Sequence, residues 1–471
     1  MLFSSLEFLL LFLPVTAVVY FVIPKCAKNY WLLITSLIFY AWGEPKFVFI
    51  MAGSIVFNYF AAILVEKYRD KSCKKKIVLI VSVVFNLGLL FIFKYLNFTT
   101  EILNGIFSKV PVTEIVLPIG ISFFTFQAMS YVIDVYRGIP AQHNICFLGL
   151  YISFFPQLIA GPIVRYTTVM EEINSRTVTL EGFSGGIKRF IVGFNKKILL
   201  ANIMAEIADA AFASEQLSVC MAWLGMVGYT LQIYFDFSAY SDMAIGLGKM
   251  FGFKFLENFN YPLISKSVTE FWRRWHISLG TWFRDYVYIP LGGSRVKSTA
   301  RKYFNIAVVW MLTGIWHGAN FTFIFWGMLH GLVIIIEKLT GEVERAEKTK
   351  AGAVFGHVYT LLVVMLGWMM FRADSLGALW TYLKAFLGIG GVAFADSQFA
   401  FFIREYAVAL AIAVLCSAPV FKKIEERAET VGGSQAVLVN SIGWIAQIIL
   451  FAVSVSFLVM NSYNPFIYFN F

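Results

Sequence analysis

The sequence predicts an all-α integral membrane protein with about 10 to 12 transmembrane helices, together with re-entrant and interfacial helices. Of its 471 residues, 59% are hydrophobic and only 14% are charged, whereas soluble domains carry about a quarter charged residues. The 49 phenylalanines and 12 tryptophans suit a lipid-facing surface with interfacial aromatic side chains. A chain of this composition cannot cover its surface with polar groups, so lipid is the expected solvent.

The apolar residues gather in runs that approach the roughly 20 residues needed to span a bilayer. Some runs are short or interrupted by polar residues, and these are expected to be re-entrant or interfacial. Because no polar stretch is long enough to form a soluble domain, residues 1–471 are predicted to form a single membrane domain. The candidate runs cover residues 6–23, 30–42, 46–65, 77–96, 115–135, 145–164, 186–212, 219–250, 301–318, 320–337, 354–371, 401–421 and 438–460.

The net charge of +10 comes from basic residues in short stretches between the apolar runs. The clearest of these stretches lies at residues 67–76, and short basic loops of membrane proteins face the cytoplasm. The turn at residues 43–45 is then expected to face outside. No basic domain is present that would bind nucleic acid.

Residues 270–289 form a different kind of segment. Trp272, Trp275 and Trp282 share one face at helical spacing, and the charged side chains avoid that face. This pattern predicts an amphipathic helix lying in the plane of the membrane interface, ended by Pro290. Its arginines, Arg273 and Arg274, are expected near phosphate groups, either of a nucleotide-bearing donor or of lipid.

His317 is the strongest candidate for chemistry, because ionisable groups within apolar runs are costly and often functional. It ends an apolar run, and Gly314 and Gly318 beside it would let a substrate or another backbone approach. A neutral imidazole can act as a general base near neutral pH; the alternative is a helix-packing histidine. His276 is second, either functional or simply interfacial. Structural roles are favoured for His143, His330 and His357.

Two carboxylates, Asp236 and Asp242, lie in an aromatic run. Structural pairing is favoured for both, and a proton or ion pathway is the alternative. The five cysteines show no CxxC spacing, so neither a metal site nor a disulfide framework is expected.

Two stretches, FWRRWHISL at residues 271–279 and LTGIWHGAN at residues 312–320, resemble the membrane-bound O-acyltransferase superfamily, MBOAT. Three further stretches, at residues 155–162, 234–242 and 464–469, are similar to its alginate O-acetyltransferase branch. The resemblance extends over nearly the whole chain.

The resemblance implies a funnel-shaped helical fold in which His317 is the catalytic histidine and His276 the family's second histidine. It implies a protein of the bacterial cytoplasmic membrane that transfers acetyl groups from cytoplasmic acetyl-CoA towards an extracytoplasmic polysaccharide. A secreted or anchored SGNH-type partner is expected to complete the delivery. No metal or bound cofactor is expected, since a thioester is already activated. The side chains expected to contact substrate are Arg273, Arg274, Trp316 and Asn320.

Two alternatives remain open. A sister branch of the superfamily transfers D-alanine from a carrier protein towards teichoic acid. A proton-coupled transporter is the rival outside enzymes, although transporters often carry internal repeats and none is evident. For the acyltransferase, His317 is expected near the bilayer midplane, where a cytoplasmic cavity meets an opening to the outside, and it acts as a general base or as a transient acetyl carrier.

Overall fold

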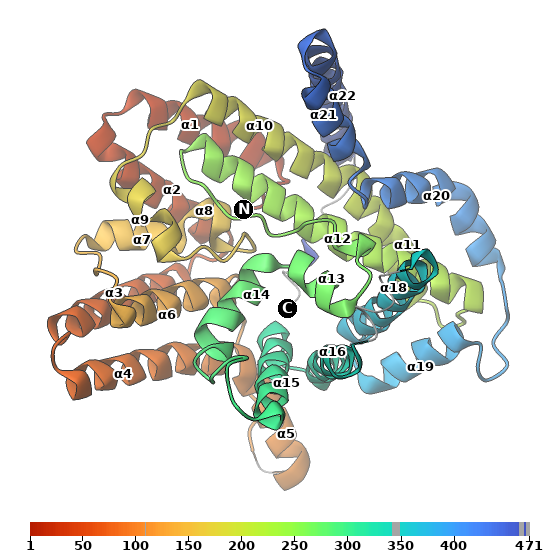
Figure 1. The fold of residues 1–471 in the computed structure, drawn as a ribbon, viewed down its shortest axis with the longest axis horizontal. Helices are drawn as coiled ribbons and strands as arrows, with labels where there is room; N and C mark the ends of the chain where they lie inside the picture. The colour runs from red at the N-terminus through yellow and green to blue at the C-terminus, as the bar shows by residue number, and fades with distance from the viewer. Residues whose placement is uncertain (109, 342–348, 461–465, 468–471) are drawn as a thin grey trace. The chain divides into compact units, whose positions relative to one another are not determined.

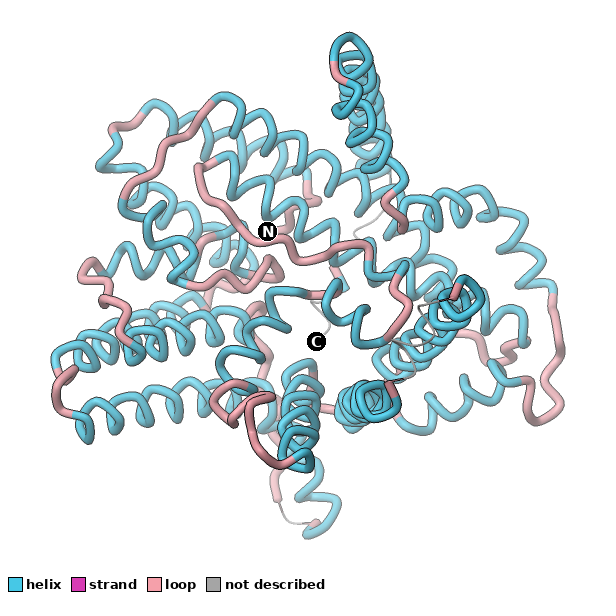
Figure 2. The backbone as a smooth tube through the Cα atoms, in the orientation of Figure 1, coloured by secondary structure: helices cyan, strands magenta, loops and turns pink. Residues whose placement is uncertain are grey.

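The computed structural model describes the whole chain except residues 109, 342–348, 461–465 and 468–471 (Figure 1). It divides into two units. The first unit comprises residues 1–190 and 240–256, and the second comprises residues 191–239 and 257–471. Over the described residues every regular element is a helix (Figure 2), which confirms the predicted all-α class. The single membrane domain stays a prediction.

The first unit contains the N-terminal helices and the end of α12. The hairpin of α3 and α4 packs against α6, and Asn58 on α3 exchanges amide hydrogen bonds with Asn86 on α4, at 3.2 and 2.8 Å. Interhelical side-chain hydrogen bonds of this kind stabilise helix pairs where no water competes. Its helices are α1 (Leu13–Val22), α2 (Lys28–Gly43), α3 (Val48–Lys67), α4 (Ser72–Leu90), α5 (Leu96–Phe107), α6 (Ile121–Arg137), α7 (Ile145–Ser153), α8 (Phe155–Leu158), α9 (Tyr166–Asn174) and α10 (Leu180–Asn195) up to residue 190.

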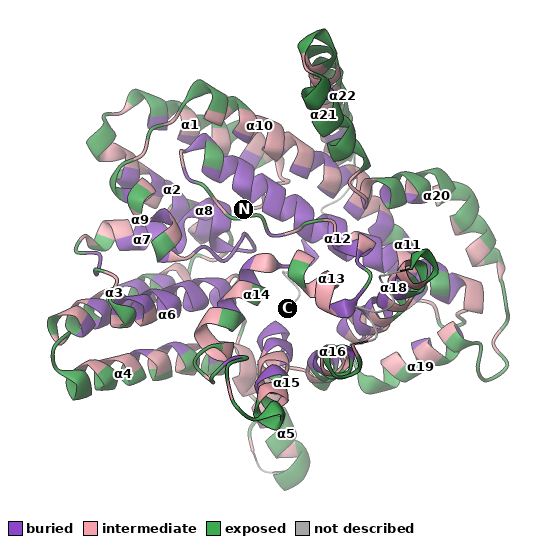
Figure 3. Cartoon of the chain, in the orientation of Figure 1, coloured by how far each residue is buried: buried purple, intermediate pink, exposed green. Residues whose placement is uncertain are grey.

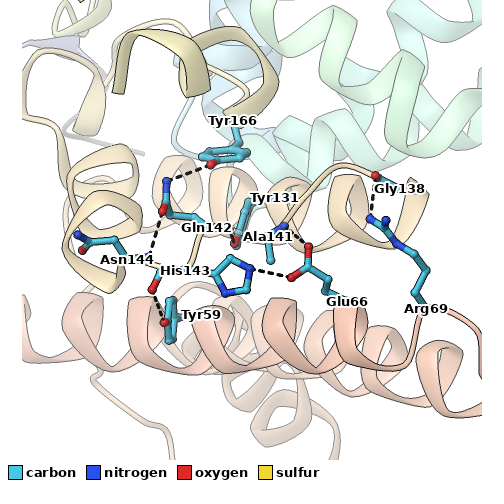
Figure 4. A network of polar contacts seen from close by, with 10 residues as sticks. All are labelled: Tyr59, Glu66, Arg69, Tyr131, Gly138, Ala141, Gln142, His143, Asn144 and Tyr166. Carbon is cyan, nitrogen blue, oxygen red and sulfur yellow. Dashed lines mark hydrogen bonds and ion pairs between the residues drawn. The ribbon is translucent and has the colours of Figure 1, made fainter. Parts of the chain in front are cut away.

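The loop between α6 and α7 is fastened to the last turns of α3 (Figure 4). The Glu66 carboxylate accepts a hydrogen bond from the backbone N–H of Ala141 at 2.9 Å and lies 2.9 Å from His143. Arg69 donates to the carbonyl oxygen of Gly138 at 3.0 Å. These contacts agree with the structural role predicted for His143, which lies beside the end of α3 that leads into the basic stretch.

The second unit carries the histidine-containing segments. The helices α15 and α16 run side by side, because Gly314 and Gly327 allow close backbone contact. A Cβ atom at Gly314 would lie 2.5 Å from the carbonyl oxygen of Phe323. The helices of this unit are α11 (Asn202–Phe212), α12 (Val219–Met250), α13 (Val268–Arg274), α14 (Ile277–Phe283), α15 (Thr299–His317), α16 (Phe321–Thr340), α18 (Lys350–Arg372), α19 (Leu376–Leu387), α20 (Ser397–Cys416), α21 (Val420–Val431) and α22 (Gly433–Met460).

Among the described residues, 6 helices are long and apolar enough to cross a membrane. Many of their large apolar side chains are exposed, as on α20 and α22, whereas α6 and α12 are mostly buried (Figure 3). These features make the chain a multi-pass membrane protein. The other predicted spans fall on shorter or more polar helices. The six are Val48–Lys67, Ser72–Phe107, Phe321–Thr340, Lys350–Arg372, Ser397–Cys416 and Gly433–Met460.

Two predicted runs have different boundaries in the structure. The run at 145–164 is broken, because α7 ends at Ser153 and the short α8 contains Pro156 at its start. Proline lacks an N–H donor and interrupts a helix that precedes it. The run at 115–135 begins as a loop. Its helix, α6, starts directly after Gly120, and the backbone of Gly120 is left-handed with φ 75°.

Candidate active site

His276 lies at a break between two short helices rather than within one long helix. The predicted continuous helix over 270–289 is wrong, since α13 ends at Arg274, α14 begins at Ile277, and the last part of the segment is a π-helical turn. His276 itself adopts a left-handed backbone with φ 45°. A non-glycine residue in this conformation is uncommon and needs support from its surroundings.

The support comes from Asn258, a fully buried residue in the loop after α12. Its side-chain oxygen, Oδ1, accepts hydrogen bonds from the backbone N–H of Ser278 at 3.1 Å and from the Ser278 hydroxyl at 2.9 Å. The same oxygen lies 3.2 Å from Nδ1 of His276. The carbonyl oxygen of Asn258 accepts from the backbone N–H of Ile277 at 3.0 Å. One asparagine therefore holds both the backbone and the ring at the break.

The start of α13 is anchored to α16 by a second buried group. The carboxylate of Glu337 accepts hydrogen bonds from the backbone N–H of Val268 at 2.7 Å and of Thr269 at 2.9 Å, and from the Thr269 hydroxyl at 2.6 Å. A carboxylate at a helix N-terminus satisfies the N–H donors that have no partner within the helix. This contact fixes the direction in which α13 leads to His276.

His276 and His317 meet around the ring of Trp316. The His276 and Trp316 ring centroids are 6.2 Å apart, and those of Trp316 and His317 are 4.9 Å apart. All three side chains are buried. Burial lowers the pKa of the His276 imidazole to about 3, so that ring is neutral at pH 7. The structure thus brings together two histidines that lie 41 residues apart in the sequence.

His317 is the last residue of α15, and aromatic rings surround it. Trp326 on α16 contacts it at 4.9 Å between ring centroids, and Phe371 on α18 at 5.2 Å. Trp326 also contacts His330 at 5.2 Å. No sequence pattern indicated Trp326, because it belongs to the next helix and shares no periodic pattern with His317.

The glycines beside His317 accommodate protein groups. A Cβ atom at Gly314 would meet the backbone of α16, as described above, and one at Gly318 would overlap the ring of Phe323. Of the two roles expected for these glycines, the approach of another backbone is the one seen at Gly314. Their small size sets the position of the end of α15.

The four side chains predicted to contact substrate differ in their surroundings. Arg274 forms an ion pair with Glu270 at 2.9 Å. Arg273, in contrast, is exposed to solvent. Trp316 is buried and lies close to both histidine rings. Asn320 caps α16, accepting from the backbone N–H of Thr322 at 3.1 Å. Substrate contact by these side chains stays a prediction.

The carboxylates of α12 are paired, as predicted. Asp236 lies 2.6 Å from the ammonium group of Lys197, and both side chains are at most 4% exposed. Asp236 also accepts a hydrogen bond from the backbone N–H of Ile467 at 2.7 Å, so it anchors part of the C-terminal segment. Within the first unit, Asp242 pairs with Arg189 at 2.7 Å.

The remaining histidines and possible metal ligands take structural places. His330 is buried between Trp272, at 5.0 Å between ring centroids, and Trp310, at 5.7 Å. His357 lies 3.1 Å from the carbonyl oxygen of Ser265 through Nδ1. Over the residues with a described placement, no group of three or more His, Cys, Asp and Glu side chains is arranged to hold a metal ion.

Comparison with known proteins places the chain in a family. The family model of MBOAT, the membrane-bound O-acyltransferase family, matches residues 77–376, which include both site histidines. The probable alginate O-acetylase AlgI of Pseudomonas aeruginosa is 41% identical, with 100% of each chain covered. The peptidoglycan O-acetyltransferase of Helicobacter pylori is 33% identical over 100% of this chain and 98% of its own.

A more distant relative is the teichoic acid D-alanyltransferase of Bacillus subtilis, 29% identical over 54% of this chain and 68% of its own. The family match covers more than half of the chain, and the two O-acetyltransferase relatives cover all of it. An all-helical membrane fold with two buried histidines around one tryptophan fits this result. The chain belongs to the membrane-bound O-acyltransferase family and is an O-acyltransferase.

Proposed function

We propose that this acyltransferase moves an acetyl group from cytoplasmic acetyl-CoA across a bacterial cytoplasmic membrane, towards an extracytoplasmic polysaccharide or its partner acetyltransferase. The full-length similarity to an alginate O-acetylase and to a peptidoglycan O-acetyltransferase supports acetyl as the group and a polysaccharide as the acceptor. The observation that supports this chemistry is that two buried histidines, His276 and His317, both lie close to the ring of Trp316.

The reaction exchanges one acyl bond for another. The acceptor oxygen forms a C–O bond to the acetyl carbon, the C–S bond to CoA breaks, and the hydroxyl proton ends on the departing thiol. His317 either removes that proton from the acceptor or takes the acetyl group before passing it on; both routes give the same products. A general base of this kind contributes a factor of about 10²–10⁴ to the rate.

The neighbouring residues have assigned roles in this proposal. His276 orients or assists the reacting hydroxyl, and Trp316 packs close to both imidazoles. Exposed Arg273 binds the phosphates of CoA, because a guanidinium group matches phosphate geometry. An SGNH-type acetyltransferase outside the membrane would pass the acetyl group on to the polymer.

The second candidate function is D-alanyl transfer, favoured only by the similarity to the teichoic acid D-alanyltransferase. The test is to release ester-linked groups from surface polysaccharides by mild base, in isogenic cells with and without the gene. The proposal expects acetate to fall when the gene is deleted and to return with the wild-type gene. Loss of ester-linked D-alanine with unchanged acetate would replace acetyl transfer by D-alanyl transfer.

A further inference from the structure

The hydrogen bonds of Asn258 determine more than the backbone at the break between α13 and α14. A backbone N–H group can only donate, so the Asn258 atom that faces the N–H of Ser278 at 3.1 Å is the carbonyl oxygen. That same oxygen is the atom within 3.2 Å of Nδ1 of His276. An acceptor therefore faces Nδ1.

We infer that Asn258 is a positioning residue that fixes His276 in the tautomer protonated on Nδ1, leaving the lone pair of the ring on Nε2. A neutral imidazole carries one N–H, and the hydrogen bond made by one ring nitrogen sets the state of the other. Asn258 is 0% exposed and His276 is 2% exposed, so water does not compete with this contact. The left-handed backbone of His276 places the ring against this oxygen.

The tautomer restricts what His276 can do in the site. With its lone pair on Nε2, the ring accepts a hydrogen bond or a proton through that atom, as from an acceptor hydroxyl. It cannot donate from Nε2 to the carbonyl oxygen of a thioester. This assignment of role rests on the proposed acetyl transfer, whereas the tautomer itself does not depend on any activity.

The tautomer is measurable by ¹⁵N NMR of histidine-labelled protein in lipid nanodiscs, because protonated and unprotonated ring nitrogens have well-separated shifts. The chain has 5 histidines, and the signal that disappears in His276→Gln belongs to His276. We expect a protonated Nδ1 and an unprotonated Nε2 in the wild type. A proton on Nε2 overturns the inference.

Three variants test the part played by Asn258. Asn258→Leu has a similar volume and no acceptor, so the proton should redistribute towards Nε2. Asn258→Asp keeps an acceptor and should keep the wild-type tautomer. Ser278→Ala removes a hydroxyl that donates to Asn258 at 2.9 Å and lies 3.5 Å from Nδ1 of His276, but retains the backbone N–H that orients Asn258. It should keep the wild-type tautomer, which distinguishes the Asn258 oxygen from the hydroxyl as the group that sets it. A wild-type tautomer in folded Asn258→Leu contradicts the positioning role.

The kinetic readout separates positioning from general structural damage. Asn258→Leu should lower the transfer rate by up to about 10²–10⁴-fold, the range for general acid–base assistance. Asn258→Asp should retain turnover, but its negative charge raises the pKa of His276. The acid limb of its pH–rate profile should therefore move to higher pH. If Asn258→Asp leaves the profile unmoved, His276 is not the acceptor. Absence of acetyl transfer by the wild type would refute the proposed function and leave the NMR result intact.

Discussion

The ion pair between Lys197 and Asp236 gives a quantitative prediction about stability. The two groups are 2.6 Å apart and nearly inaccessible to solvent. Removing one partner of a buried ion pair typically costs about 3–5 kcal/mol. Asp236→Asn and Lys197→Met should each lower the free energy of unfolding by this amount, although Asp236→Asn still offers an oxygen to Ile467.

The double variant distinguishes the buried charge from ordinary loss of packing. Lys197→Met combined with Asp236→Asn leaves no unpaired charge, so its cost should be smaller than that of either single change. The assay is denaturant-induced unfolding in detergent micelles, with size-exclusion chromatography to verify that each protein is monodisperse. Lys422→Met is the control, because Lys422 and Glu426 form an exposed pair at 3.7 Å, worth about 0–1 kcal/mol. Two outcomes would show that the buried pair does not stabilise the protein in this way. The single variants could unfold with a free energy within about 1 kcal/mol of the wild type, or the cost of the double variant could equal the sum of the two single costs.

Three further predictions concern the site and its helices. Because burial lowers the pKa of His276 to about 3 from an ordinary 6.5, the unfolded chain binds more protons between these values. Between pH 7 and pH 5 the unfolding free energy of the wild type should therefore fall by about 2 kcal/mol more than that of His276→Gln. The same pH dependence in both proteins would contradict the burial of His276. Gly327→Ala should cost about 1–3 kcal/mol by overlapping the Trp310 carbonyl, whereas Gly53→Ala, with no atom within 4 Å, should cost nothing. Arg273→Gln should raise the KM for acetyl-CoA but not for acetyl-pantetheine; an unchanged KM for both donors would assign Arg273 to lipid.

Much of the fold follows from apolar run length. The runs at residues 219–250 and 301–318 correspond closely to α12 and α15, because one continuous helix satisfies its backbone internally. Breaks were harder to predict. The interruption at His276 depends on Asn258, 18 residues earlier in the chain, and no local pattern records that contact. Helical periodicity alone therefore predicted one helix where the structure has two.

Only part of the candidate site could be predicted, again because contacts between distant segments leave no local pattern in the sequence. His317 and Asp236 stand out in sequence because ionisable groups within apolar runs require an explanation. The partner of Asp236, Lys197, comes from a segment 39 residues earlier, and the caps formed by Glu337 and Asn258 join segments distant in the chain. Such partners are set by tertiary packing, which the linear pattern does not encode.

The proposed acyl transfer depends above all on His317, acting as general base or as acetyl carrier. The direct measurement is acetyl transfer from labelled acetyl-CoA by purified, monodisperse His317→Ala protein, compared with the wild type at equal amounts in the same lipid. The loss of a general base or acetyl carrier should lower turnover by about 10²–10⁴-fold while the protein still folds and inserts. Turnover close to that of the wild type would remove His317 from the mechanism and contradict this account.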